Sequence, residues 1–290
     1  MMTSLTPITR RLIEASSEVL GPPDQISFIH SVLAQVGLPR RKPEGESFDR
    51  TSGQVSLRIT SGDLWNGKTW QKQPLPYGTR PRLALVHISS EAVRTRNHVV
   101  DVGDSTREFL LRLGIDTGGK EYAGFKKQMS ALAACEMRLG IGASTLRVQP
   151  VEEFAAWLHP TGKQQTLWPG QVTLSQRFFE SLVEAAVPLD PRALKALSHT
   201  ALGLDVYTWL AHRLCRVKTI KGDRVSWVAL KEQFGHEYAE LKDFRREMLK
   251  ALGAVKAVYP DAGLEQTHGG LLLKPSKPPI PKIAVSKPRG

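Results

Sequence analysis

The spacing of apolar residues predicts a succession of short helices and strands along most of the chain. Residues 1–40 contain two stretches of helical spacing and are predicted to form a helical N-terminal segment. Residues 41–74 are polar and rich in glycine and proline, which predicts a linker. Within this linker, apolar and polar residues alternate at 55–59, as in a short strand, and Trp65 and Trp70 are expected in a loop.

The segment 75–170 has a recognisable order of elements. Apolar spacing predicts a helix over 81–95, then a short strand over 98–103, and then a helix capped by Asp104. A second helix follows, with apolar residues on one face. Residues 137–148 are broken by two glycines, as the two strands of a β-hairpin would be.

The segment 171–274 repeats this order more clearly. Residues 224–234 are predicted to form a short strand and a helix, and 238–252 an amphipathic helix. Two apolar strands split by a glycine-bearing loop are predicted over 255–273. This order is the plan of a winged helix. We therefore predict an α+β, mainly helical fold with two tandem winged-helix domains that have short β-hairpin wings, followed by a disordered, basic, proline-rich tail over 275–290.

The charge of the chain narrows the class of partner. Lysine and arginine number 40 against 28 acidic residues, which gives a formal net charge of +12. Such a surplus favours a polyanion. No run approaches the roughly 20 apolar residues of a spanning helix, and no basic helix has the broad apolar face of a lipid-surface helix. We expect no membrane partner and no signal peptide. Cys135 and Cys215 are expected to be buried in a protein of the reducing cytoplasm.

The helix predicted at 238–252 carries the main candidate site. Its apolar stripe faces inward, and its basic residues lie outside that stripe: Lys242, Arg245, Arg246 and Lys250. A helix fits the major groove of B-DNA, where Arg or Lys can bond a guanine edge. Lys242 and Arg246, one turn apart, are expected nearest the groove. An alternative stays open, because Asp243 and Glu247 could pair with these side chains and leave an ordinary solvated face.

Further basic residues extend this prediction. Arg224, Lys256 and His268 are placed on or near the second wing unit, where a basic side chain would meet the DNA backbone. The first unit offers Lys120, Lys126, Lys127 and Gln128 on the polar side of its second helix. That helix continues into small, nearly uncharged residues, which favours dimerisation or backbone contact for the first unit.

The sequence lacks residues that the common catalytic motifs require. The run GIDTGGK at 114–120 approaches a phosphate-binding loop, but position 121 is glutamate, and a predicted helix precedes it where a strand is required. No two histidines have the His-x-His spacing that a nickase would use to hold a metal. We expect no enzyme, no metal and no cofactor.

Several stretches together resemble a known family. LPYGTRPRLALVHISSEAVRTR and VVDVGDSTREFLLRLGI are similar to the central signature of the RepA C-terminal family of plasmid replication initiators. Later pieces agree in order: VTLSQRFFE, VPLDPRALKAL, ALGLDVYTWLAHRL and VSWVALKEQFG. The resemblance spans residues 75–276.

The resemblance implies a bacterial, plasmid-encoded, cytoplasmic protein with tandem winged helices. It implies binding to direct repeats of duplex DNA at a plasmid origin, opening of the adjacent AT-rich region, and recruitment of the host initiator and replicative helicase. It also implies a homodimer that represses its own gene and so takes part in plasmid copy control. A winged-helix transcriptional repressor without initiator activity is the alternative of like kind. An origin nickase or NTPase is the alternative from another class.

Overall fold

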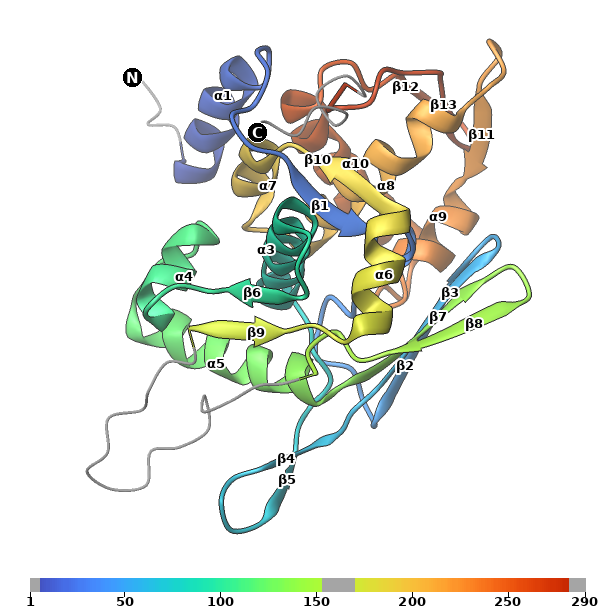
Figure 1. Cartoon of the computed structure of the whole chain (residues 1–290). Coiled ribbons are helices and arrows are strands. Elements are labelled where there is room, and N and C mark those ends of the chain that lie inside the picture. Colours follow the sequence, from blue (N-terminus) through green and yellow to red (C-terminus); the bar gives the residue numbers. More distant parts are fainter. Residues whose placement is uncertain (1–5, 153–169, 282–290) are drawn as a thin grey trace. The chain divides into compact units, whose positions relative to one another are not determined.

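The computed structural model describes residues 6–152 and 170–281 (Figure 1). The chain divides into two compact units. We call residues 28–33 and 37–186 the central unit, and residues 1–27, 34–36 and 187–290 the C-terminal unit. The predicted boundary between domains was residue 170, whereas this division falls after residue 186 and groups the N-terminal helix with the C-terminal residues. The connector predicted at 151–170 lies almost entirely outside the described residues.

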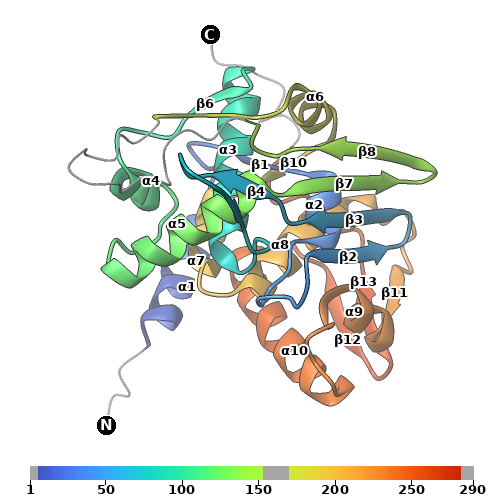
Figure 2. The same cartoon turned by 90° about the horizontal axis from the view of Figure 1, so that it is seen from below.

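An antiparallel four-stranded sheet, ordered β2-β3-β7-β8, organises the central unit (Figure 2). Its strands are β2 (Ser47–Ser52), β3 (Val55–Thr60), β7 (Glu136–Ile141) and β8 (Ser144–Val148). The strand predicted at 55–59 and the hairpin predicted at 137–148 are present. Strand β2 occupies part of the predicted linker. Its apolar alternation is hidden in the sequence because Arg50, a charged residue, faces the buried side and lies over the Phe48 ring.

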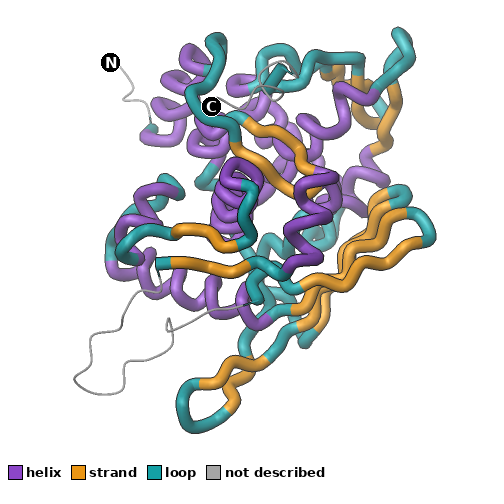
Figure 3. Tube along the Cα trace, in the orientation of Figure 1, coloured by secondary structure: helices purple, strands orange, loops and turns teal. Residues whose placement is uncertain are grey.

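The tryptophans that were expected in a loop close a second hairpin, β4 (Asp63–Trp65) and β5 (Trp70–Lys72). Figures 1 and 3 show this hairpin extending away from the end of the four-stranded sheet. Trp65 and Trp70 are direct cross-strand neighbours, with ring centroids 5.5 Å apart. The Asn66 side chain accepts hydrogen bonds from the backbone N–H groups of Lys68 and Thr69 and so fixes the turn.

The helices of the central unit follow the predicted order. They are α3 (Thr79–Thr95), α4 (Thr106–Arg112), α5 (Gly119–Ala134) and α6 (Gln176–Ala185). The cap of α4 is Ser105, whose hydroxyl accepts from Glu108 N, and not the predicted Asp104. Between α3 and α4, β6 (Val99–Asp101) pairs with β9 (Gln171–Thr173) and not with the β7–β8 hairpin.

The described part of the C-terminal unit packs five α-helices around one core. Its helices are α1 (Pro7–Glu18), α7 (Pro191–Leu197), α8 (Ala201–Arg213), α9 (Trp227–Phe234) and α10 (Leu241–Val258), with a 3-10 turn at Leu214–Arg216. An antiparallel sheet ordered β11-β13-β12 completes it, with β11 (Asp223–Ser226), β12 (Leu264–Thr267) and β13 (Gly270–Leu273). Helix α10 runs past the predicted end because Val255 and Val258 continue its buried stripe.

Three short elements carry the chain between the units: β1 (Ser27–His30), α2 (Ser31–Val36) and β10 (Ala186–Leu189). The second N-terminal helix was predicted to start earlier, but the chain is extended up to His30, whose ring caps α2. The tail was predicted to be disordered from residue 275. Its first residues pack instead, since the Tyr259 hydroxyl donates to Lys277 O and Ile280 is fully buried.

The fold is α+β, with more helix than strand. Among the helices that the structure describes, none is both long enough and apolar enough to cross a membrane.

Candidate nucleic-acid interface

Helix α10 has the amphipathic pattern that the sequence predicted. Six of its residues are buried: Phe244, Met248, Ala251, Leu252, Val255 and Val258. Burial of this stripe fixes the rotation of the helix and turns the opposite face to solvent. Lys242, Arg246 and Lys250 follow one another at intervals of four and are all exposed. They form one ridge, which we call the basic ridge.

Acidic neighbours pair with part of the basic ridge. Arg246 lies 2.9 Å from Asp243 and 3.3 Å from Glu247, and Lys250 Nζ lies 3.0 Å from Glu247. The hydrogen bond to Glu247 is the largest of the effects that raise the pKa of Arg246. The local pairing considered above as an alternative is therefore present. Exposed pairs of this kind contribute little to stability, so a phosphate or base edge can replace them at low cost.

Arg245 was predicted on the same face, but it packs back onto the fold. Its guanidinium lies over the ring of Trp227 at 5.2 Å from the centroid, and Trp227 is buried. This cation–π contact ties the start of α9 to α10. Ser226 caps α9 by accepting from Ala229 N at 3.1 Å. Sequence reasoning missed Trp227, although an aromatic residue beside a capping serine could have indicated an anchored helix start.

The remaining predicted residues of the C-terminal unit are separated by the fold. Lys256 is exposed in the last turn of α10 and does not lie on the hairpin. His268 is exposed in the turn between β12 and β13. Arg224 is exposed on β11, opposite Leu272 of β13. The turn is short, and Gly269 O accepts from Trp227 N at 3.0 Å, so the hairpin is attached to the start of α9.

We predict that Gly270→Ala destabilises this sheet. A Cβ atom at position 270 would lie 2.0 Å from Val225 O and 2.8 Å from Ser226 Cα, both backbone atoms. Backbone cannot rotate aside as a side chain can, so β13 must move away from β11. Forced overpacking of this kind costs about 1–3 kcal/mol. Urea denaturation should show this loss, whereas Gly253→Ala, where no atom lies within 4 Å of the added Cβ, should not lower stability. Equal midpoints for the Gly270 variant and the parent would contradict the prediction.

The predicted residues of the first unit lie on α5 in different environments. Lys120 and Lys127 are exposed and Lys126 is half-buried. Gln128 is only 4% exposed, and its Oε1 accepts from Tyr77 N at 2.7 Å. The prediction that Gln128 contacts DNA is therefore wrong, because its side chain holds the loop before α3.

The small residues of α5 are buried within the central unit. Ser130, Ala131 and Ala133 all lie inside the core, and a Cβ at Gly62 would fall 2.1 Å from Ala134 O. These residues allow the chain around Gly62 to approach the helix closely. Because they are buried inside one unit, these small residues give no indication of a dimer interface. Cys135 is buried as predicted, whereas Cys215 is exposed.

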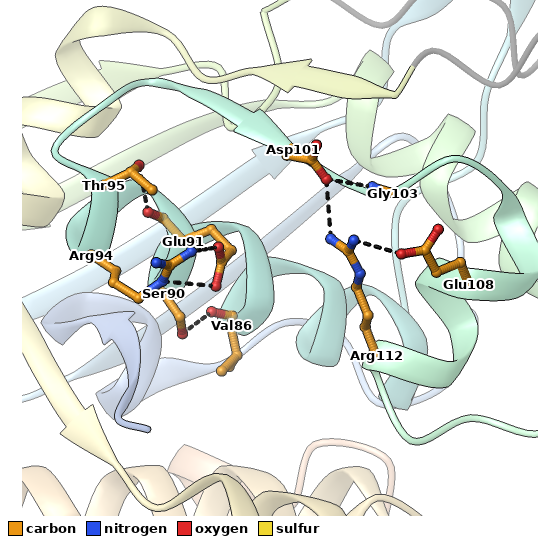
Figure 4. Close-up of polar contacts among 9 residues, drawn as sticks. All are labelled: Val86, Ser90, Glu91, Arg94, Thr95, Asp101, Gly103, Glu108 and Arg112. Atoms are coloured by element: carbon orange, nitrogen blue, oxygen red, sulfur yellow. Dashed lines mark hydrogen bonds and ion pairs between the residues drawn. The ribbon is translucent and has the colours of Figure 1, made fainter. Parts of the chain in front are cut away.

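Residues of the family-like stretches make structural contacts around α3 and α4 (Figure 4). Arg112 bonds both Glu108, at 2.6 Å, and Asp101, at 3.1 Å. The backbone N–H of Gly103 is the main cause that lowers the pKa of Asp101, and the N–H of Asp104 does the same for Glu108. These charges join the strand β6 to the first turn of α4.

Residues 113–118 form the turn between α4 and α5, and Gly119 and Lys120 begin α5, so a helix precedes the segment 114–120 as predicted. Within the described residues, no group of three or more His, Cys, Asp or Glu side chains is placed to hold a metal ion.

Comparisons with known proteins give one family match and two similar structures. The model of the family of plasmid-encoded RepA proteins matches residues 75–233, more than half of the chain. A selenomethionine structure of domains 2 and 3 of RctB has 12% identity and a TM-score of 0.51, covering 83% of this chain and 95% of that one. A second RctB structure, of domains 2–3, has 12% identity and a TM-score of 0.49, covering 82% and 85%. No curated protein sequence matches. The similarity to the selenomethionine RctB structure concerns the fold alone. The family match extends over the signature stretches, and the chain belongs to the RepA family of plasmid replication initiators.

Proposed function

We propose that this initiator binds directly repeated duplex sites at a plasmid origin through the C-terminal unit, with α10 in the major groove. The observation that carries this proposal is the basic ridge, presented by a helix whose opposite face is fully committed to the core. The proposal is supported by the element order of the unit and by its sheet order β11-β13-β12, which we interpret as a winged helix with α9 and α10 as its helix pair. A winged helix places its second helix against base edges.

We propose a second, looser winged helix in the central unit, with α4 and α5 as the helix pair and β7–β8 as the wing. Its wing belongs to a wider sheet, and Lys120 and Lys127 remain exposed on α5. We propose that this unit adds contacts to DNA or to a second copy of the chain. Opening of an AT-rich region and recruitment of the host initiator and replicative helicase complete the proposed role. We propose no catalytic step for this chain.

Specific binding is tested by a gel-shift titration of the full chain at about 150 mM salt. The repeats beside its own gene are compared with random duplex of equal length, because charge alone gives non-specific binding. We expect a preference for the repeats. Equal affinity for both duplexes would overturn the proposal. Loss of plasmid maintenance on deletion of the gene would support an initiator. Maintenance of the plasmid without the gene would favour a transcriptional repressor that has no initiator activity.

We predict that Arg246→Ala weakens binding to the repeats by roughly 5- to 150-fold, with preference relaxed at one base pair, since a bidentate contact to guanine would be lost. Arg94→Ala is the matched control. Both arginines have side chains that are 57% exposed, and each pairs with an acidic residue three positions earlier. Binding by the Arg94 variant should equal that of the parent. A uniform loss over all sequences would place Arg246 on a phosphate and contradict base reading.

A further inference from the structure

Three arginines lie side by side on the solvent face of the four-stranded sheet. Arg58 of β3 is directly opposite Arg138 of β7, and Arg138 is directly opposite Arg147 of β8. Their side chains are 53%, 38% and 66% exposed. Like charges that face each other across strands destabilise a sheet. The fold therefore tolerates two such pairs in one row, which we call the arginine row.

Acidic side chains neutralise the arginine row only in part. Asp49, opposite Arg58 on β2, lies 2.5 Å from it. Glu136 lies 2.9 Å from Arg138 and 3.3 Å from Arg147, so one carboxylate serves two guanidinium groups through the same oxygen. Two carboxylates thus face three arginines. Each guanidinium has five donors, and most of them remain available to an anion.

The adjacent row of the same face carries only small side chains. Its residues, in order across the sheet, are Thr51, Ser56, Gly140 and Thr145. A Cβ at Gly140 would come within 3.2 Å of Ser56 Cβ, so a side chain there would crowd the row. The Thr51 and Ser56 hydroxyls bond each other at 3.1 Å, and these small side chains leave the approach to the neighbouring guanidinium groups open to phosphate oxygens. This row and the arginine row form a strip that an extended polyanion could follow.

The width of the sheet decides which part of DNA it can meet. Three inter-strand spacings of about 4.8 Å make the face about 14 Å wide between its outer strands, before side chains are counted. The major groove of B-DNA is about 12 Å wide, so this face cannot enter it. It can only lie against the outside of the duplex, where the phosphates are. Arg58 also lies outside the residues that match the family model.

We propose that the arginine row binds the sugar-phosphate backbone of duplex DNA, as a contact that is independent of sequence. This inference rests on the proposed DNA-binding function and adds to it a second surface, on a unit other than the one that carries the basic ridge. Arg58 of this row lies on β3, the short strand predicted at 55–59, and its partner Asp49 lies on β2, in the part of the chain predicted as a linker.

The test compares the salt dependence of binding to random duplex for three forms of the full chain. The variant carries Arg58→Gln, Arg138→Gln and Arg147→Gln. The control carries Arg94→Gln, Arg107→Gln and Arg177→Gln, which removes three exposed charges from helices of the same unit. Each lost phosphate contact lowers the slope of log K against log[salt] by about 0.9, so we expect a decrease approaching 2.7 for the variant and little change for the control.

Substitution of the row by three lysines retains the charges and should largely restore the slope, provided that far-ultraviolet circular dichroism shows all forms to be folded. The variant should weaken binding to origin repeats and random duplex by the same factor. A slope equal to that of the control variant would overturn the proposal, and so would loss of preference for the repeats with an unchanged slope. If the parent shows no preference for the repeats, the proposed function is wrong. The slope measured on random duplex still tests whether the arginine row contacts phosphates.

Discussion

Replacing Arg82 by alanine is expected to lower the free energy of unfolding by roughly 3–5 kcal/mol. Arg82 is only 5% exposed, and its guanidinium donates to three backbone carbonyls: Gly78 O at 2.6 Å, Pro39 O at 3.0 Å and Leu38 O at 2.5 Å. Pro39 O keeps its bond from Gly78 N, and Leu38 O keeps a longer one from Arg50 Nη1. The loss is therefore that of hydrogen bonds from a charged group, each of which contributes about 1.5–3 kcal/mol. Relief from burying the charged guanidinium offsets part of this sum.

The measurement is urea denaturation followed by far-ultraviolet circular dichroism. Arg82→Lys should recover only part of the loss, because an ammonium group cannot reproduce the planar fork that reaches three carbonyls. Arg94→Ala, on the exposed side of the same helix, is the control and should behave as the parent. Equal midpoints for the Arg82→Ala and Arg94→Ala variants would contradict a structural role. This role also accounts for an arginine in the stretch TRPRLAL without assigning it to DNA.

Helices such as α10 could be predicted because they bury a continuous stripe. In α10, apolar residues at intervals of three and four are the buried ones, and periodicity alone is enough to find them. Strands were harder where a charged residue takes a buried position. Arg50 interrupts the apolar alternation of β2, so the sequence favoured a linker where the structure has the edge of a sheet.

Pairing between distant strands could not be predicted from local patterns. The sequence places β6 between two helices, but its partner is β9, about seventy residues later. The arginine row depends on the register of three strands, of which β3 and β7 are also distant in sequence. Gln128 shows the same limit on a helix, since its amide is used by the backbone of Tyr77 and not by solvent.

The positions of the basic-ridge residues could be predicted from the sequence, but the packing of the neighbouring Arg245 could not. Spacing identified Lys242, Arg246 and Lys250 as neighbours, and all three are exposed. The contact of Arg245 with Trp227 required knowledge of where α9 begins relative to α10. The spacing of apolar residues therefore selects the face of a helix, whereas tertiary packing selects which side chains on that face remain exposed.

His30 makes the stability of the fold depend on pH, because its buried neutral ring is held in one tautomer by two hydrogen bonds. The ring is fully buried, and Nδ1 accepts from Val32 N at 3.1 Å as the cap of α2. Because Nδ1 is an acceptor, the proton of the neutral ring must be on Nε2, which donates to the Ser181 hydroxyl at 2.8 Å. Protonation of Nδ1 would place its N–H group against the backbone N–H of Val32, and the hydrogen bond between them would be lost. Burial lowers the pKa of His30 from 6.5 to about 4.

The central unit is therefore expected to lose stability as the pH falls from about 6.5 towards 4. In that window the unfolded chain takes up a proton on His30 that the folded chain does not, and this favours unfolding. A difference of about 2.5 in pKa corresponds to roughly 3 kcal/mol, fully present above pH 6.5. His30→Asn keeps an acceptor for Val32 N but does not titrate, so its urea midpoint should fall less steeply over the same range. His212, whose pKa is also lowered to about 4, is common to both proteins and cancels in the comparison. Identical pH profiles for the parent and His30→Asn would show that His30 ionises freely in the folded state.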